Sequence, residues 1–403
     1  MPATVSEDYV YLDWAATAPL CEEAAEAMAP FMVPGRANLP VGGNANSLHA
    51  PGRAAFAALE DARRLLARDL GASRPDEIVF TSGATEADNA ALFGIAAAAV
   101  EERRQHGIAF ADAPHVITTA VEHDAVLAPA KRLEAQGFRV TRLVPNRQGL
   151  IEVHALAEAL DGDTVLVSVQ AANSEVGSFQ HLAELARTAH AAGALFHTDA
   201  VQALGKAPIN LDALGVDAAS MSAHQVGGPK GMGALYLRAR TPFRPHMLGG
   251  GQESGRRSGT QNVCGAVGFA AACHAACALQ GSEAVRLRNL RDRLYAGLVA
   301  LPGVEATVNV PAGSDDFLPT IVHVLVDGLE SETLILRFDM LGFGVSGGSA
   351  CSSHSLEPSH VLHALGISDD RAHGALRVSM GRLTTEQDVD SFIAAATTVL
   401  DWS

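Results

Sequence analysis

Lysine and aromatic residues are scarce in this sequence. Lys131, Lys206 and Lys230 are the only lysines among 403 residues, arginine supplies the rest of the 29 basic residues, and aromatic residues make up 5% of the chain. Acidic residues outnumber basic ones by 45 to 29, which gives a formal net charge of −16 at pH 7. A negative charge of this size repels nucleic-acid backbones and anionic lipids. We therefore expect no nucleic-acid partner and no membrane partner.

Cysteine is sparse as well. The chain has five cysteines, an odd number, and is too long to need disulfide staples. Both facts favour a reducing compartment, and we expect a cytoplasmic protein. Residues 1–8 are polar and acidic, unlike the basic and apolar start of a signal peptide. The stretch most similar to a membrane span, Val263–Leu279, consists mainly of small residues, and we interpret it as a buried helix.

Short apolar runs alternate with longer alanine-rich segments of helical period, which is typical of helices packed on both faces of a mostly parallel sheet. The predicted strands are Glu77–Thr81, His115–Ala120, Arg139–Val144, Thr164–Val169, Ala194–Thr198 and Gly233–Leu237. The predicted helices are Pro51–Leu70, Thr85–His106, Val126–Gln136, Leu182–Ala192 and Asn262–Leu279. An arginine-rich helix to Leu301 and a strand at Thr320–Val326 follow. The sequence thus predicts an α/β protein with a large domain, residues 21–263, and a smaller α+β domain, residues 1–20 and 264–403.

Two polar motifs follow predicted strands. Thr81–Glu86 opens a helix, so its backbone N–H groups are placed to bind a phosphate, although an ordinary helix cap explains the same residues. Asp199, in His197–Gln202, comes at the carboxyl end of a strand, where open α/β sheets bind ligands. A carboxylate there can keep a heterocyclic nitrogen protonated, but it can also be a simple cap.

Two further motifs contain reactive side chains. Ser220–Gly231 joins small polar residues to a glycine-rich turn, and a turn alone accounts for it. Ser346–His354 places Cys351 among small polar residues, a setting that favours a reactive thiol over the buried, inert cysteine that is more usual. Cys273 and Cys277 share a helix face, but no second ligand pair has zinc-site spacing, so we expect core packing and no bound metal.

Taken together, these motifs resemble those of the pyridoxal phosphate cysteine desulfurases of iron-sulfur assembly, in the class V aminotransferase family with the fold-type I architecture. The resemblance extends over nearly the whole chain in the order of the family. Its blocks are Tyr11–Thr17, Gly43–His49, Thr81–Asn89, Glu122–Leu127, His197–Gln202, Gly249–Thr260, Ser349–Ser359 and Arg377–Arg382.

The resemblance implies a binding site for pyridoxal 5′-phosphate. The residues implied for its phosphate are Ala84, Thr85, Ser222 and His224, with Thr260 reaching the cofactor of the neighbouring subunit in a homodimer. His123 is expected to stack on the pyridine ring as a catalytic residue, Asp199 to pair with the ring nitrogen, and Gln202 to bind the phenolic oxygen. Asn44 and Arg377 are the residues implied for substrate binding, and a guanidinium suits a carboxylate.

The activity implied by the resemblance is conversion of L-cysteine to L-alanine. The thiolate of Cys351 takes the sulfur as a persulfide and delivers it to an acceptor, such as an iron-sulfur scaffold protein. The resemblance also implies a homodimer.

The sequence departs from the family at two of these positions. The family's Schiff-base lysine follows the His of a Ser-x-His-Lys motif, and here that position is Gln225. An amide forms no imine and is no base for the Cα proton. The three lysines match other positions, so we expect no covalent bond between protein and cofactor. Ser174 replaces a usual Asn, and we expect it to reach the ring oxygen by a shorter side chain.

Three interpretations of Gln225 remain open. The chain is a cysteine desulfurase whose chemistry Gln225 impairs, a catalytically silent homologue that acts as a binding or scaffold partner, or another class V lyase or aminotransferase. Cys351, Asp199 and Arg377 together favour the first, because a chain released from catalysis has no chemical need for all three.

Overall fold

In the computed structural model, which describes residue 6, residues 8–348 and residues 358–401, a seven-stranded sheet forms the centre of the larger part. Its strands, in spatial order, are β2 (Ile78–Thr81), β8 (Gly233–Leu237), β7 (Ala218–Ser222), β6 (Leu195–Asp199), β5 (Thr164–Ser168), β3 (His115–Thr119) and β4 (Arg139–Leu143). All neighbours are parallel except β8, which is antiparallel to both β2 and β7. The prediction of a mostly parallel sheet is confirmed.

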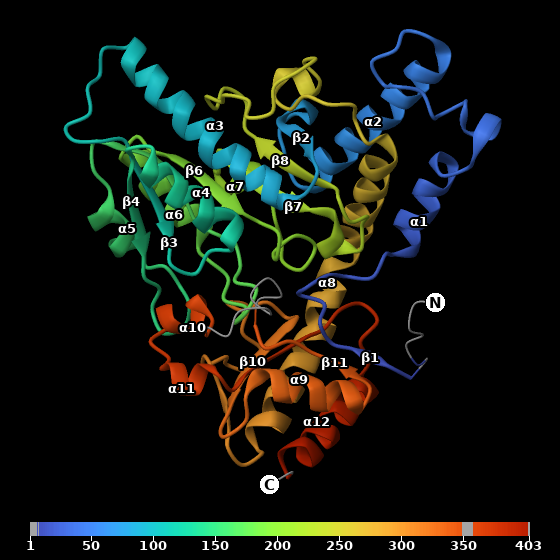
Figure 1. The fold of residues 1–403 in the computed structure, drawn as a ribbon, viewed down its shortest axis with the longest axis vertical. Coiled ribbons are helices and arrows are strands. Elements are labelled where there is room, and N and C mark those ends of the chain that lie inside the picture. Colours follow the sequence, from blue (N-terminus) through green and yellow to red (C-terminus); the bar gives the residue numbers. More distant parts are fainter. Residues whose placement is uncertain (1–5, 7, 349–357, 402–403) are drawn as a thin grey trace.

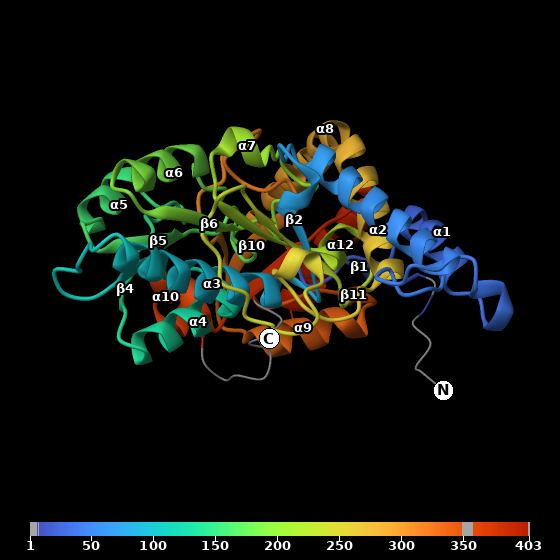
Figure 2. The same cartoon turned by 90° about the horizontal axis from the view of Figure 1, so that it is seen from above.

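Helices cover both faces of this sheet, as the sequence predicts. They are α2 (Ala50–Asp69), α3 (Ala84–Gln105), α4 (Asp124–Ala135), α5 (Val153–Ala159), α6 (Leu182–Ala191) and α7 (Leu211–Leu214). Figure 2 shows α3 and α4 on one face and α5, α6 and α7 on the other. Leu166 and Phe196 are fully buried within the resulting layers, and the α/β class of the larger part is confirmed.

One strand of the sheet was not predicted. β7 lies between β6 and β8, and all five of its residues are buried. Its sequence, Ala-Ala-Ser-Met-Ser, has none of the β-branched or aromatic residues that mark strands. Small side chains suit this place because α3 packs against β7. Tertiary packing, rather than intrinsic strand preference, makes this segment a strand.

The smaller part contains a three-stranded antiparallel sheet and a two-stranded parallel one (Figure 1). The strands are β9 (Val304–Ala306), β10 (Ile321–Val326) and β12 (Ala375–Ser379) in the first sheet, and β1 (Val10–Tyr11) and β11 (Phe343–Gly344) in the second. The helices are α9 (Ser331–Met340), α10 (His360–Ala364), α11 (Asp369–Ala372) and α12 (Glu386–Leu400). Because β1 pairs with β11, the start of the chain packs on the smaller part.

A single long helix, α8 (Val263–Val299), joins the two parts (Figure 1). The sequence suggested two helical segments with a change near Leu279, and the structure makes them one helix of 37 residues. Phe269 belongs to the core of the larger part, whereas Leu294 belongs to that of the smaller part. By length and composition alone, α8 could cross a membrane, since an 18-residue stretch of it has a mean hydropathy of 1.5. Of that stretch, 44% is buried inside the structure. The helix also packs against α2 and against α1 (Glu22–Met28).

Candidate functional site

A cavity of about 330 Å³ lies where β6 and β7 end, beside the first turn of α3. Ten of the thirteen site residues expected from the sequence line it: Ala84, Thr85, His123, Ser174, Asp199, Gln202, Ser222, His224, Gln225 and Arg377. They come from segments far apart in the sequence. The fold therefore gathers most of the expected residues around one space.

The first turn of α3 supplies one wall of the cavity. The backbone N–H groups of Ala84 and Thr85 have no acceptor within the helix, because they precede its first hydrogen-bonded turn. Ser222 and His224 line the cavity with them. Nδ1 of His224 lies 3.1 Å from Oγ1 of Thr17, and burial lowers the pKa of its imidazole. Free N–H groups at the positive end of a helix suit a phosphate.

Buried carboxyl groups line the cavity beside the sheet. Asp199 ends β6, is 8% exposed, and accepts a hydrogen bond at Oδ1 from the N–H of Val201 over 2.9 Å. Burial raises the pKa of its carboxyl group. The charge of His123 lowers the pKa of the same carboxyl group, and a protonated ring nitrogen is a further suitable cationic partner for Asp199.

Asp88, from α3, adds a second carboxyl group that was not predicted. Its side chain is fully buried, and neither oxygen has a hydrogen-bond partner among the described residues. Burial raises the pKa of Asp88 well above its usual value, and the charge of Asp199 raises it further. Oδ1 of Asp88 lies 3.6 Å from Nε2 of His197, whose pKa burial lowers to about 3. Burial thus favours the neutral forms of these groups, and a cationic ligand that enters would favour ionisation of the carboxyl groups.

His123 caps the start of α4. Its Nδ1 accepts a hydrogen bond of 3.1 Å from the N–H of Ala125, which fixes the imidazole at the edge of the cavity. The placement is consistent with an aromatic ring held over a planar ligand.

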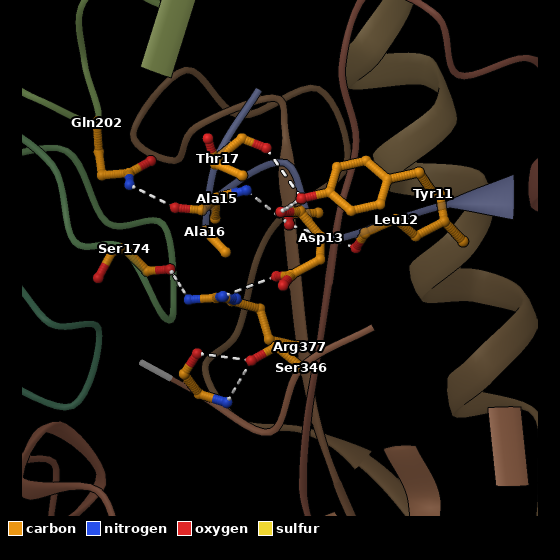
Figure 3. Close-up of polar contacts among 12 residues, drawn as sticks. Tyr11, Leu12, Asp13, Ala15, Ala16, Thr17, Ser174, Gln202, Ser346 and Arg377 are labelled. Carbon is orange, nitrogen blue, oxygen red and sulfur yellow. Dashed lines mark hydrogen bonds and ion pairs between the residues drawn. The ribbon is translucent and has the colours of Figure 1, made fainter. Parts of the chain in front are cut away.

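Arg377, on β12, brings the smaller part of the chain into the site. The side chain is 1% exposed and donates to the backbone oxygen of Ser174 over 3.0 Å and to Oδ1 of Asp13 over 2.9 Å (Figure 3). Its Nε has no hydrogen-bond partner in the part of the chain that the structure describes. Ser346 pairs with the Arg377 backbone in both directions, which fixes the strand. A buried guanidinium with a free donor is suited to hold a substrate carboxylate.

Gln225 occupies the wall where the family resemblance places a lysine. Its Nε2 donates to the carbonyl of Ala15 over 2.7 Å and to that of Ala16 over 3.3 Å. Its Oε1 accepts a hydrogen bond of 3.1 Å from Nζ of Lys206. The same Nζ donates over 2.9 Å to Oε1 of Gln202, whose Nε2 also binds the Ala15 carbonyl, as Figure 3 shows. Both amides are thus held in one orientation.

Three expected residues do not line the cavity as described. Asn44 is exposed, and its Oδ1 accepts from the backbone N–H of Asn46. Thr260 is exposed as well. Cys351 lies outside the described residues. The roles of all three stay predictions.

The described residues on each side of the Cys351 segment lie beside the same glutamate. Ser359 Oγ donates to Oε2 of Glu175 over 2.6 Å, and a Cβ added to Gly348 would lie 3.4 Å from that same oxygen. Glu175 adjoins Ser174, which binds Arg377. Gly348 and Ser359 therefore both lie near the part of the cavity wall that Ser174 and Arg377 form.

Sequence reasoning missed several residues of the site: Asp13, Asp88, Gln170 and Lys206. Asp13 belongs to the Tyr11–Thr17 block that carries the resemblance, but the block gave no role for its side chain. Asp88 likewise lies in the Thr81–Asn89 block, which was given no role for it. In the described part of the chain no group of three His, Cys, Asp or Glu side chains is arranged to hold a metal ion.

Similar proteins decide the family. The family model "Aminotransferase class-V" matches residues 10–392. A cysteine desulfurase IscS from Dictyoglomus turgidum is 42% identical over 381 residues, which cover 94% of this chain and 92% of that protein. The chain belongs to the class V aminotransferase family, among its cysteine desulfurases.

Solved structures of this family have the same fold. A NifS-like protein is 36% identical, with a TM-score of 0.86 over 98% of this chain and all of that one. SspA in complex with cysteine is 32% identical, with a TM-score of 0.74 over 92% of this chain and 98% of that one. The fold-type I architecture expected from the resemblance is confirmed.

The family's cofactor is pyridoxal phosphate, and the residues of this cavity fit it except at one position. The free N–H groups of α3 suit its phosphate, and the buried carboxyl groups of Asp199 and Asp88 suit its cationic ring nitrogen. Gln225 provides no amine for its aldehyde. The site therefore holds the cofactor by contacts alone at that position.

Proposed function

We propose that this chain converts L-cysteine to L-alanine, leaving the sulfur as a persulfide on Cys351, with its chemistry slowed by Gln225. The observation that supports this best is the cavity, in which a phosphate-binding helix end, buried Asp199 and buried Arg377 converge. When bound, pyridoxal phosphate supplies an electron sink that weakens the bonds at the substrate Cα. The residues of the chain bind, orient and protect the reacting groups.

Each residue has a defined task in this proposal. Arg377 binds the substrate carboxylate, which replaces Asp13 as its anionic partner. Asp199 keeps the ring nitrogen protonated, and His123 covers the ring. The thiolate of Cys351 attacks the sulfur of the bound cysteine: an S–S bond forms, the C–S bond breaks with its electron pair moving to carbon, and a proton completes alanine.

Gln225 removes the base that moves the Cα proton in the family. Loss of a general base costs about 10²- to 10⁴-fold in rate. We therefore propose a slow enzyme rather than an inert one, because the other groups remain in place.

The partners and the location extend the same proposal. The sulfur passes from Cys351 to an acceptor protein, such as an iron-sulfur scaffold. The chain forms a homodimer in which the exposed Thr260 reaches the cofactor phosphate of the partner subunit. The odd number of cysteines supports a cytoplasmic location.

Mass spectrometry of the cofactor-loaded protein after addition of L-cysteine tests the proposal. We expect alanine in solution and one added sulfur atom on the peptide that contains Cys351. In Cys351→Ala the added sulfur should be absent while cofactor binding is unchanged. Alanine formation without sulfur on Cys351 would contradict the proposed carrier.

Gln225 itself favours a second candidate, a catalytically silent homologue that binds partner proteins. This candidate predicts no alanine from the wild-type chain over days of incubation. It also predicts that the cofactor-free protein binds an iron-sulfur scaffold protein as tightly as the loaded protein does.

A further inference from the structure

Lys206 lies beside the residue that replaces the family's lysine. The two are 19 positions apart in the sequence, yet Nζ of Lys206 is 3.1 Å from Oε1 of Gln225 and 2.9 Å from Oε1 of Gln202. Both glutamines line the cavity, whereas Lys206 does not. Only the side chains of Gln202 and Gln225, among the described residues that contact its amine, lie between Lys206 and the proposed cofactor cavity.

Neither of the other lysines has this position. Lys131, on α4, and Lys230, after the 3₁₀ turn Ala223–Val226, are both exposed, and neither lines the cavity. Lys206 is partly exposed, but its amine contacts two glutamines that are only 8% and 5% exposed. It is the lysine that the fold brings to the site.

The surroundings of Lys206 favour the neutral, nucleophilic form of its amine. Among the described residues it forms no ion pair with a carboxylate, since its hydrogen bonds go to two amides. Burial lowers the pKa of Lys206 to about 7, and the positive charge of Arg377 contributes to the shift. Near neutral pH a large part of the amine therefore has a free lone pair.

Space beside Lys206 allows it to move. Lys206 and Gln225 both line a second cavity of about 90 Å³, on the side of Trp14 and Leu204. Rotation of the Gln225 side chain to another staggered rotamer would break its bonds to the Ala15 and Ala16 carbonyls and would let Nζ approach the larger cavity. The long, unbranched lysine side chain can follow that path.

We propose that Lys206 is the amine that bonds covalently to the aldehyde of pyridoxal phosphate in this chain, in place of a lysine at position 225. Nζ attacks the aldehyde carbon, the carbonyl oxygen leaves as water with both amine protons, and a C=N bond replaces the C=O bond. No oxidant or reductant is needed. A bond to Lys206 replaces the expectation that no covalent bond forms between protein and cofactor. It rests on the proposed function only because the cofactor must enter this cavity.

Borohydride trapping tests this in the unmodified chain. The protein is mixed with one equivalent of pyridoxal phosphate, reduced with sodium borohydride and mapped by peptide mass spectrometry. We expect the phosphopyridoxyl group on Lys206 at a level at least about tenfold above Lys131 or Lys230, because the bound aldehyde has a high effective concentration at one amine only. Labelling of Lys206 should also increase as pH rises through 7. Labelling of Lys206 at or below the level of Lys131 overturns the proposal.

Matched variants keep the test specific. Lys206→Arg preserves the charge and hydrogen-bond donors but should lose the label, whereas Lys230→Arg should retain it. Gln225→Lys should move the label to residue 225. Continued labelling of residue 206 in Gln225→Lys, at the wild-type level, would show that the reaction happens outside the site and would overturn the proposal.

The outcome is separable from that of the proposed function. If cofactor remains bound, alanine forms and Lys206 carries no label, the inference fails and the desulfurase proposal stands. If Lys206 is labelled but no alanine forms and Cys351 gains no sulfur, the inference stands and the desulfurase proposal fails.

Discussion

Arg377 shows how a single residue can prepare a substrate site. It is buried against Asp13 and Ser174, so its charge is already compensated before substrate arrives. Burial raises the pKa of Asp13, while the guanidinium lowers it. A substrate carboxylate that enters replaces one carboxylate by another, so the guanidinium keeps an anionic partner.

Arg377→Lys should weaken binding of L-cysteine. Lysine is a point charge and cannot form the planar, two-pronged contact with a carboxylate. Since hydrogen bonds to charged groups are worth about 1.5–3 kcal/mol, the apparent Kd should rise by roughly 10- to 100-fold. Spectral titration of the cofactor-loaded protein with L-cysteine measures it. Arg293→Lys, at a surface pair with Asp390, should leave the Kd unchanged; an unchanged Kd in Arg377→Lys would refute the assignment.

Glu122 is a second residue whose burial has a measurable consequence. It is fully buried, and Oε1 accepts hydrogen bonds from Thr119 and Gln170, whereas Oε2 has no partner among residues 8–348 and 358–401. Burial raises the pKa of Glu122 to about 8. The folded state therefore binds a proton that the unfolded chain releases near pH 4, so the stabilising effect of Glu122 is lost as pH rises through about 8.

Glu122→Gln should remove this pH dependence. Relative to the wild-type protein, the free energy of unfolding of the variant should increase between pH 5 and pH 8, because only the wild-type residue ionises. Urea unfolding of both proteins at several pH values measures the difference between their free energies of unfolding. Titration of His197 and Lys206 contributes equally to both proteins and therefore cancels in this difference. A difference that stays constant across this range would mean that Glu122 is not protonated in the folded state.

At the scale of elements, the start of β8 supports the start of α3. A Cβ added to Gly233 would lie 2.7 Å from the Cα and carbonyl carbon of Gly83 and 2.6 Å from the carbonyl oxygen of Met221. These are backbone atoms, so relief requires movement of the helix start that is proposed to bind the phosphate. The close approach of two elements thus sets the geometry of the phosphate wall.

Gly233→Ala should therefore weaken cofactor binding and lower stability by about 1–3 kcal/mol, the usual cost of overpacking. Equilibrium dialysis with pyridoxal phosphate and thermal unfolding measure the two effects. Gly162→Ala is the matched control, because a Cβ there meets no atom within 4 Å. Wild-type cofactor affinity in Gly233→Ala would show that the contact does not position α3.

The elements also show what a sequence can and cannot predict. Six strands of the large sheet were predictable because their apolar runs have strand length, whereas β7 was not, since its small residues become a strand only through packing. Ten of the residues expected from the motif blocks line one cavity. They did not place Lys206 or Asp88, because the contact of Lys206 with Gln225 and the isolation of Asp88 arise from the tertiary fold.

At the scale of the whole molecule, α8 couples the two hydrophobic cores. Its first half packs into the larger part and its second half into the smaller one, which contributes Arg377 to the cavity. Because one continuous helix belongs to both cores, we expect unfolding in a single transition.

Leu294→Ala should lower the free energy of unfolding by about 2–5 kcal/mol, because it leaves a cavity in a fully buried site. Cofactor release should coincide with loss of helix signal in circular dichroism. Leu279→Ala, at a position that is 43% exposed, should cost at most about 0.5 kcal/mol. Two separate transitions in Leu294→Ala would contradict coupling through α8.

Gln225 is the residue proposed to limit the rate of this desulfurase. The most direct test is the rate of alanine formation from L-cysteine by Gln225→Lys compared with the wild-type chain, each with saturating pyridoxal phosphate. We predict an increase of about 10²- to 10⁴-fold, abolished by adding Cys351→Ala. A rate in Gln225→Lys no higher than that of the wild-type chain, with the cofactor bound, would contradict the account.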